Sequence, residues 1–512
     1  MHRPPTAEAE IAEELAVVRP GLLPRYAAKL PGARAAVLTR LWRALAYEPL
    51  PWLAGREPGA HGLTLRLADG RSLRGPHADP YATSAYVTAV RLDGERYDDP
   101  ARLMTALGVP HAAGFAAELA GSAASLALSR AGADHPKEWP VGFPHAGGRA
   151  QDWEWEQRVV DGHPFHPNCR SRPGFSVADQ LAYGPEHRPV VGLGTVAVPA
   201  ADCLLSGDWP DELRSADDLL VPVHPWQAAH VLGRPYDAWR PARPLMSLRT
   251  LALPGGPHVK TALSARLTSS VRDISVSSVR SAAPLSDFAE DLAARTGGLL
   301  HVTRTLGAVS AHSPDLAALL RESPEVYAAP GEHVLPVAAL ATTSLPGSPS
   351  WLAAFARLAL TVGLLLLEAG VALEAHGQNL LVILSADGTP LRLVYRDLAD
   401  IRISPARLAR HGITPPGLAA RMGTDDPTAL RRKLFGSLVA GALAGTAGSG
   451  PALAAALADV LPGLPRTPDL AALREGPLPT KALTLMRLSP GGTGDVWTTL
   501  PHPCAARFPV TG

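Results

Sequence analysis

Residues 373–397 read LEAHGQNLLVILSADGTPLRLVYRD, and this stretch decides how the C-terminal part of the chain folds. Two apolar runs flank Asp387-Gly388, a dipeptide that favours a type I′ turn because both central positions of that turn need positive φ. The stretch therefore predicts a β-hairpin over 379–397. Counting outward from the turn gives the expected cross-strand pairs: Leu384 with Leu391, Val382 with Leu393, Asn379 with Arg396, and Gln378 with Asp397.

The open end of this hairpin gathers polar side chains that lie far apart in sequence. They are Glu374, His376, Gln378, Asn379 and Asp397. Carboxylate and amide oxygens are ligands that Mg²⁺ prefers, and a histidine can donate to a phosphoryl oxygen or a substrate carboxylate. The cluster predicts a site for ATP and Mg²⁺. A polar strand end that faces solvent, with His376 as a loop residue, is the plainer alternative.

A second cluster lies in the middle of the chain. Ser247, Arg249 and Thr250 precede a predicted strand over 258–267, in which Lys260, Ser264 and Arg266 share one face. The following Thr268-Ser-Ser resembles a helix N-cap, which would place Thr268 and Arg272 one turn apart. Hydroxyls, helix-start N–H groups and cations together predict an anion site. The alternative is an amphipathic strand with a solvated outer face, which is the favoured interpretation for Arg266.

This anion site carries a geometric difficulty. A straight strand would separate Lys260 from Thr268 by roughly 26 Å. The two residues can share one ligand only if the strand bends or the ligand is long.

Two His-Pro segments are predicted to be rigid, because each proline holds the preceding residue extended. Residues 162–175 read GHPFHPNCRSRPGF, and 221–227 read VPVHPWQ. The first suits the placing of an imidazole and arginines against an anion, whereas the second favours structural packing. A zinc site through His163, His166 and Cys169 lacks an evident fourth ligand.

The remaining sequence predicts an α+β architecture of two or three lobes. Helical spacing covers 7–50 and 101–133, with a short polar hairpin at 62–75. Between about 150 and 310 the pattern becomes β-rich, with strands expected at 189–198, 219–223, 258–267 and 298–306. Long Ala/Leu-rich helices return after 348. No glycine-rich phosphate loop of the Rossmann or P-loop type is present in the sequence.

Composition excludes several classes of partner. A net charge of +1 gives no global field for nucleic acid or an acidic membrane surface. Two apolar stretches, 352–373 and 434–457, are interrupted by charges or by Gly-Ser-Gly-Pro and are interpreted as buried helices. Three scattered cysteines and an acidic N-terminus without an apolar run indicate a cytoplasmic protein. Only five of the basic residues are lysines, so a lysine inside a regular element merits attention.

Taken together, the motifs resemble the IucA/IucC family of NRPS-independent siderophore (NIS) synthetases. The matching segments are GHPFHPNCRSRPGF, VPVHPWQ, SLRT, KTALSARLTSSVRDI, EAHGQNLLV and YRDLADIRI, in the family's order between residues 162 and 403. The resemblance implies a cupped-hand enzyme with thumb, fingers and palm lobes, here 1–150, 151–335 and 336–512, and a ferric-reductase-like segment in the last lobe. It also implies a homodimer.

Such enzymes use ATP and Mg²⁺ to adenylate a carboxylate, commonly of citrate, and an amine, hydroxylamine or alcohol then attacks the acyl-adenylate. The resemblance implies that Ser247, Arg249, Thr250, Lys260 and Arg272 hold phosphates, with help from His166. It assigns the substrate carboxylates to Thr268, Arg272 and His376, and nucleotide and metal to Glu374, Gln378, Asn379 and Asp397. His376, Arg272 and Lys260 are then the predicted catalytic residues, and Glu374, Asn379 and Asp397 the predicted metal ligands.

One position departs from the family pattern. Arg170 stands where a lysine is usual, which keeps the charge but not the geometry of a point donor. Two other hypotheses remain open on the residues alone: a kinase-like phosphotransferase, and a nucleotide-binding homologue without catalytic activity.

Overall fold

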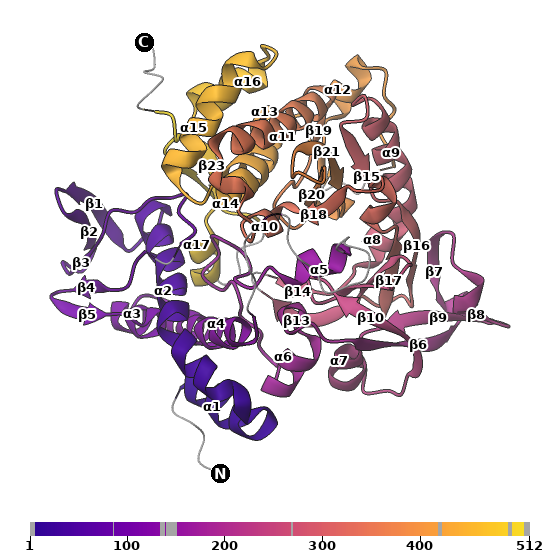
Figure 1. Ribbon diagram of the computed structural model, residues 1–512, viewed down its shortest axis with the longest axis horizontal. Helices are drawn as coiled ribbons and strands as arrows, with labels where there is room; N and C mark the ends of the chain where they lie inside the picture. Colours follow the sequence, from indigo (N-terminus) through magenta and orange to yellow (C-terminus); the bar gives the residue numbers. More distant parts are fainter. Residues whose placement is uncertain are drawn as a thin grey trace.

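The computed structural model describes residues 6–84, 86–133, 139, 151–267, 270–417, 422–489 and 494–505. Helices and mostly antiparallel sheets occur in separate stretches of the chain, so the expected α+β class is confirmed. In Figure 1 the N-terminal elements lie at the left and below, the middle elements at the right, and the C-terminal elements above. The site described below lies among these three groups.

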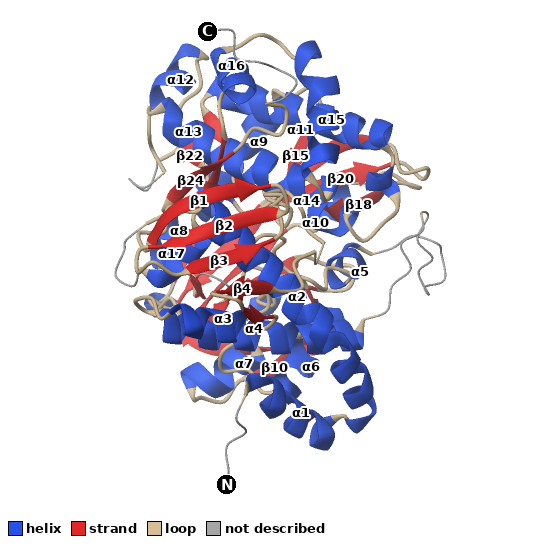
Figure 2. Ribbon diagram, turned by 90° about the vertical axis from the view of Figure 1, so that its left-hand side faces the viewer, coloured by secondary structure: helices blue, strands red, loops and turns tan. Residues whose placement is uncertain are grey.

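The N-terminal group combines four helices with a sheet. The helices are α1 (Ala7–Val18), α2 (Leu23–Tyr47), α3 (Pro100–Leu107) and α4 (Ala112–Gly132). The antiparallel strands, in spatial order, are β1 (Leu53–Gly59), β2 (Gly62–Leu67), β3 (Ser72–Gly75), β4 (Val90–Leu92) and β5 (Glu95–Tyr97). The hairpin predicted at 62–75 is therefore confirmed, but it belongs to a larger sheet that helical spacing did not predict (Figure 2).

A nine-stranded sheet forms the middle group, as the β-rich pattern predicted. Its spatial order is β7 (Leu204–Gly207), β16 (Thr305–Ser310), β17 (Ala317–Arg321), β12 (His258–Thr261), β11 (Thr250–Ala252), β10 (Asp237–Pro244), β6 (Val191–Pro199), β9 (Asp218–Val223) and β8 (Arg214–Ser215). The helices of this part are α5 (Asp152–Gln157), α6 (Val177–Tyr183), α7 (Pro225–Gln227), α8 (Val276–Arg280) and α9 (Ala282–Ala294).

The strand predicted over 258–267 is two strands, which corrects the local prediction. β12 ends at Thr261, and β13 (Leu263–Leu267) turns back through β14 (Ser270–Arg272) as a separate antiparallel pair. The helix start predicted at Thr268 is wrong, because the next helix is α8, capped by the Ser275 side chain. The hairpin instead brings Arg272 opposite Leu263, two residues after the end of β12. The predicted separation of Lys260 from Thr268 stays untested, because Thr268 lies outside the described residues.

In the C-terminal group, a long helix delivers the hairpin to the centre. α11 (Pro349–Ala369) ends at Gly370, whose φ of 112° would strain any residue with a Cβ. The chain then pairs β19 (Val371–Ala372) with β22 (Arg402–Ile403) and enters the predicted hairpin. The hairpin strands β20 (Leu380–Leu384) and β21 (Pro390–Tyr395) lie in a four-stranded sheet in the order β15 (Leu300–Val302), β21, β20 and β18 (His333–Pro336).

The predicted pairing of the hairpin strands is correct near the site and wrong at the turn. Val382 pairs with Leu393, and the Arg396 N–H donates to the Asn379 carbonyl at 3.0 Å, as expected. Leu384 pairs with Pro390 instead of Leu391. Gly388 is the loop residue with positive φ, and the Ser385 N–H donates to the Thr389 carbonyl, so the loop has three residues in place of a two-residue type I′ turn.

One further strand prediction needs correction. The stretch 298–306 contributes β15 to the C-terminal sheet, where it runs parallel to β21, and it also begins β16 of the middle sheet. α9 packs between these strands, so this stretch links the cores of the two groups.

The last 100 residues of the described chain are mainly helical. They comprise α12 (Pro405–Arg410), α13 (Pro427–Leu434), a π-helix at Phe435–Leu443, α14 (Ala444–Ala447), α15 (Gly450–Val460), α16 (Pro468–Glu475), β23 (Leu478–Lys481), α17 (Leu483–Leu488) and β24 (Trp497–Leu500). α17 returns to the N-terminal group, where the buried Glu48 carboxylate accepts from the Thr484 and Leu485 N–H groups. Arg487 also pairs with Glu118 of α4.

Two helices, α4 and α11, are long and apolar enough to cross a membrane by length and composition. A third candidate is the bent pair Pro427–Ala447 and Gly450–Gly463. Residues 352–373 were expected to be too interrupted by charges to span a membrane, and for α11 that expectation was wrong. Inside the fold, 67% of the apolar stretch of α4 and 61% of that of α11 is buried. Both helices therefore belong largely to the protein core.

Candidate active site

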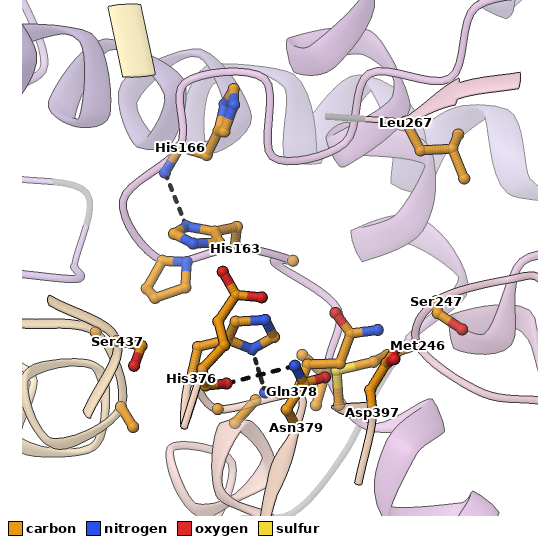
Figure 3. Close-up of a pocket in the computed structure, with 18 of the residues that line it drawn as sticks. His163, His166, Met246, Ser247, Leu267, His376, Gln378, Asn379, Asp397 and Ser437 are labelled. Carbon is orange, nitrogen blue, oxygen red and sulfur yellow. Dashed lines mark hydrogen bonds between the residues drawn. The ribbon is translucent and has the colours of Figure 1, made fainter. Parts of the chain in front are cut away.

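A cavity of about 1220 Å³ lies where the three groups of elements meet. It is lined by all the described residues that the sequence predicted for the site. These are His166, Ser247, Arg249, Thr250, Lys260, Arg272, Glu374, His376, Gln378, Asn379 and Asp397. Thr268 lies outside the described residues. Figure 3 shows Ser247 and Asp397 on one side of His376, with His163 and His166 on a loop above it.

An ion pair joins the middle sheet to the hairpin at the centre of this cavity. Lys260 Nζ, on β12, donates to Asp397 Oδ2 at 2.7 Å, and Arg321 at the end of β17 lies 3.7 Å from Oδ1. Burial alone would raise the pKa of Asp397, but Lys260 and Arg321 lower it, so this carboxylate stays ionised. Burial lowers the pKa of Lys260, and Asp397 opposes that effect.

Arg249 and Arg272 contribute further positive charge to the cavity. Arg249 donates to the carbonyls of Arg272 and Asp273 at 2.7 and 2.6 Å, which fixes its guanidinium against the β13–β14 hairpin. Arg272 donates to the Leu267 carbonyl at 3.2 Å. Burial lowers the pKa of both groups, yet arginine remains charged at any ordinary pH. Four cations therefore surround Asp397.

The segment that precedes β20 turns tightly around His376. His376 Nδ1 accepts from the Gln378 N–H at 3.2 Å, and the His376 carbonyl accepts from the Asn379 N–H at 2.9 Å. Because Nδ1 is an acceptor, a neutral ring carries its proton on Nε2. Burial lowers the pKa of His376, which keeps the ring neutral. His376 is thus an N–H donor that lines the cavity.

The two histidines of the first His-Pro segment have the same arrangement. His163 Nδ1 accepts from the N–H groups of Phe165 and His166, and His166 Nδ1 accepts from that of Asn168. Burial lowers the pKa of His166 to about 3, so it too is a neutral donor through Nε2. That Nε2 is buried and has no partner among the described residues. A ligand acceptor in the cavity would satisfy it.

Glu374 is paired with two lysines. Its Oε1 lies 3.0 Å from Lys433 Nζ and 3.4 Å from Lys481 Nζ. The predicted metal ligands Glu374, Asn379 and Asp397 all line the cavity, and their assignment to a metal ion stays a prediction. Within the described residues, no group of three or more His, Cys, Asp or Glu could hold a metal ion, so the zinc site through His163, His166 and Cys169 is wrong.

Several residues at the cavity were not predicted from the sequence. Arg321 ends a strand whose AALLR pattern looks like part of a helix. Arg396 pairs with the buried Glu156 at 2.5 Å and ties the hairpin to α5. Lys433 and Lys481 could have been found from the rarity of lysine, since all four described lysines line this cavity.

The cavity has the charge of a polyanion site. Thirteen lysine and arginine residues line it, against five aspartates and glutamates, in a chain whose net charge is only +1. Low-dielectric walls lined by one sign of charge concentrate the opposite charge. A nucleoside triphosphate together with a polycarboxylate would match this excess.

Arg170 is part of the scaffold of the cavity wall. Its Nε donates to the Val160 carbonyl at 2.6 Å and its guanidinium also contacts the Val159 carbonyl and the buried Glu186. A forked guanidinium suits these three acceptors better than a point donor.

Two family models match parts of this chain. Residues 152–342 match the model of the IucA / IucC family, and 349–496 match that of the ferric iron reductase FhuF-like transporter. The middle part of the chain is thus similar to the IucA/IucC family. All the cation-bearing strands of the site lie in the first match, and the hairpin with its aspartate lies in the second. The predicted ferric-reductase-like segment is thereby confirmed.

Curated members of the IucA/IucC family are distant in sequence. The citryl-spermidine/3,4-dihydroxybenzoyl-citryl-spermidine:spermidine ligase of Bacillus anthracis is 24% identical over 48% of this chain and 51% of its own length. The chain spans about half the length of such relatives.

Solved structures of the IucA/IucC family share the fold. The petrobactin biosynthesis protein AsbB of Bacillus anthracis matches with a TM-score of 0.76 and 18% identity, over 95% of this chain and 98% of its own. The ATP-bound aerobactin synthetase IucA of Klebsiella pneumoniae matches with a TM-score of 0.69 and 19% identity, over 92% and 99%. The cupped-hand architecture that the sequence predicted is that of these enzymes.

Proposed function

We propose that this protein is an ATP-dependent synthetase that adenylates a carboxylate and condenses it with an amine, hydroxylamine or alcohol, as a step of siderophore biosynthesis. The observation that carries the proposal is the Lys260–Asp397 pair, which joins a cation-rich strand cluster to the hairpin mouth inside one cavity. The match of residues 152–342 to the IucA/IucC family and the names of the relatives, which specify citrate and amine substrates, support it.

In the first step, a carboxylate oxygen of the acid attacks the α-phosphorus of ATP. An acyl–oxygen–phosphorus bond forms, the bond to the β-phosphate breaks, and pyrophosphate leaves. Arg249, Lys260 and Arg272 would stabilise the charge that develops on the phosphates, because they are already fixed and need no reorganisation. Ser247 and Thr250, which share a turn, would add hydroxyl or N–H donors.

His376 and Arg272 would hold the substrate carboxylates, as would Thr268. A neutral imidazole suits this task, since its Nε2–H can donate without competing for the proton of the acid. Glu374, Gln378 and His166 are assigned to the nucleotide side of the cavity.

Asn379 and Asp397 fit Mg²⁺ as the one or two protein oxygen ligands that this ion takes when phosphates supply others. When bound there, Mg²⁺ would neutralise charge on the phosphates. Asp397 is already ionised, so it needs no proton loss to serve as a ligand.

In the second step, the nucleophile forms a bond to the acyl carbon, the carbon–oxygen bond to AMP breaks, and a proton leaves to solvent. The product is an amide or an ester. Citrate or a citrate derivative is the acid favoured by the relatives' names. The protein is further proposed to act in the cytoplasm as a homodimer, with lobes near 1–150, 151–335 and 336–512.

The decisive experiment is ATP–pyrophosphate exchange with a panel of di- and tricarboxylates, citrate among them. We expect exchange that depends on one acid, and AMP as the nucleotide product once an amine is added. ADP as product would favour a phosphotransferase, and no exchange with any acid of the panel would overturn the proposal.

A further inference from the structure

One side chain of helix α5 contacts two walls of the cavity, although no residue of α5 lines it. Glu156 is buried, with 1% of its surface exposed. Its Oε1 accepts from the Arg396 guanidinium at 2.5 Å, and its Oε2 accepts from the Met246 N–H at 3.1 Å. Figure 1 shows α5 at the centre of the molecule, between β10 and β18. The carboxylate of Glu156 therefore bridges the middle group and the C-terminal hairpin.

The Met246 end of this bridge holds a strained turn. Residues 245–250 lead from β10 into β11, and we call them the Ser247 turn. Leu248 has a φ of 63° there, a left-handed conformation that is unfavourable for a bulky residue and persists only where the surroundings impose it. The turn carries the residues that are assigned to the phosphates, Ser247, Arg249 and Thr250. Glu156 fixes the beginning of this turn from outside the cavity.

The Arg396 end of the bridge holds the mouth of the hairpin. Nε and Nη2 of Arg396 donate to the Gln378 carbonyl at 3.0 and 2.8 Å, next to Asn379 in the chain. Arg396 also directly precedes Asp397, whose φ of 72° is again left-handed. Through one guanidinium, Glu156 thus acts on both segments that carry the proposed Mg²⁺ ligands.

A second acid of α5 fixes the helix to the strand that carries Lys260. Asp152 lies one turn before Glu156, and its Oδ2 is 2.6 Å from Nε2 of His258, with both side chains buried. His258 and Lys260 are two residues apart on β12, so their side chains point to the same face. Through two carboxylates, α5 therefore contacts β12, the Ser247 turn and the hairpin mouth.

Stability alone does not explain a carboxylate at position 156. Removing two charges from water is costly, and apolar side chains of similar volume often stabilise a protein as well as a buried ion pair does. The best-attested role of such a pair is to select one arrangement of the parts that it joins. Each oxygen of Glu156 serves a different wall, and each wall contains a non-glycine residue with left-handed backbone. This placement indicates a role in the geometry of the cavity.

We propose that Glu156 is a positioning residue for adenylation, which sets the Ser247 turn and the hairpin mouth at the relative placement that the transition state requires. The proposal rests on the proposed function. Glu156 lies outside the cavity, so it acts through Met246 and Arg396 and does not touch substrate. Its loss should leave the groups that bind ATP present but misaligned, and a misplacement of about 1 Å can lower a rate about a hundredfold.

The test begins with Glu156→Gln, which keeps the length of the side chain but offers a single acceptor atom, so one of the two donors loses its partner. In acid-dependent pyrophosphate exchange, we expect kcat to fall at least about tenfold while KM for ATP changes by less than about threefold. The matched control is Glu154→Gln on the same helix, where the carboxylate accepts from the Gln151 N–H instead. The kcat of this control should equal that of the wild type.

A second variant separates positioning from stability. Glu156→Leu combined with Arg396→Met leaves neither charge of the pair buried, so it should recover most of the melting temperature that Glu156→Gln loses. Its kcat should nevertheless stay at least about tenfold below that of the wild type. This double variant decides the question if Glu156→Gln does not fold.

Recovery of kcat together with stability in the double variant would overturn the proposal, and so would a wild-type kcat in Glu156→Gln. A raised KM for ATP at unchanged kcat would also contradict it, because Glu156 would then serve the binding of ATP and not the transition state. Wild-type protein without acid-dependent exchange would instead overturn the proposed function. Exchange in the wild type that neither variant alters would overturn the positioning role alone.

Discussion

Lys260 and Asp397 are 137 residues apart in the chain, and the lysine ammonium donates to the aspartate at 2.7 Å. The pair fixes the nine-stranded sheet against the C-terminal hairpin. Each residue also faces the cavity, so the contact that holds the lobes together is part of the proposed catalytic surface.

We expect Lys260→Met to lower pyrophosphate exchange by about a hundredfold or more, since removal of one preorganised electrostatic group typically has that effect. Asp397→Asn should also lower the melting temperature, because it leaves Lys260 and Arg321 buried without a carboxylate. The matched control is Arg266→Ala, which removes an exposed cation from the adjacent β13. Near-wild-type exchange in Lys260→Met would mean that the phosphate cluster lies elsewhere.

Substitutions of His376 can test which of its ring nitrogens donates the hydrogen bond to the substrate. Because Nδ1 accepts from the Gln378 N–H, the proposed donor is Nε2. Glutamine places an amide N–H near the position of Nε2, and asparagine places one near that of Nδ1. We expect His376→Gln to keep more exchange activity than His376→Asn, with His376→Ala losing more than about 2 kcal/mol of transition-state stabilisation. The reverse order of the two amide variants would assign the role to Nδ1.

Arg170→Lys introduces the residue that the family resemblance implies at this position. The guanidinium holds the carbonyls of Val159 and Val160 and faces Glu186, contacts that a lysine cannot all make. We therefore expect destabilisation by about 1–3 kcal/mol with little change in the KM for ATP. Urea unfolding and steady-state kinetics on the same preparation check this. A large rise in KM at unchanged stability would show that Arg170 contacts the nucleotide.

Stability should fall in mild acid, and His224 should account for a measurable part of the loss. Burial lowers its pKa to about 3 in the folded state, against about 6.5 when unfolded. Below pH about 6.5 the unfolded chain takes up a proton that the folded chain excludes, so unfolding becomes easier until the pH nears the folded pKa. The loss should reach about 2 kcal/mol by pH about 4.5.

The measurement is urea unfolding of wild type and His224→Gln at pH about 6.5 and at pH about 4.5. The variant should show the smaller acid-dependent loss, and His61→Gln, at an exposed turn, should behave as wild type. An identical loss in all three proteins would exclude His224 as a source of the effect.

The local sequence predicted the hairpin mouth well, because polar residues there follow directly from two apolar strands. Val382 and Leu393 pair as expected, whereas the turn differs by one residue. A three-residue loop and a two-residue turn both accept Asp-Gly, and only the packing of the neighbouring chain decides between them.

Other features could not be read from the chain alone. After Thr261 the Ala262 N–H still donates to the Ala317 carbonyl of β17, whereas Leu263 pairs with Arg272 of β14. Tertiary contacts decide where this change of partner falls. The five-stranded sheet near the N-terminus was missed because β1, LAGREPG, has no apolar alternation and little burial. Arg321 and Glu156 reach the site through strand order and through α5, which no local pattern reveals.

The placement of lysines has a practical consequence for chemical modification. Every described ε-amine, at positions 29, 260, 433 and 481, lines the same cavity, with Lys29 exposed and Lys260 and Lys433 buried. Acylating reagents that ignore guanidinium groups would therefore react with few side chains of this protein, and most of those lie on the cavity wall. A nucleotide bound beside Lys260 should protect that amine from the reagent.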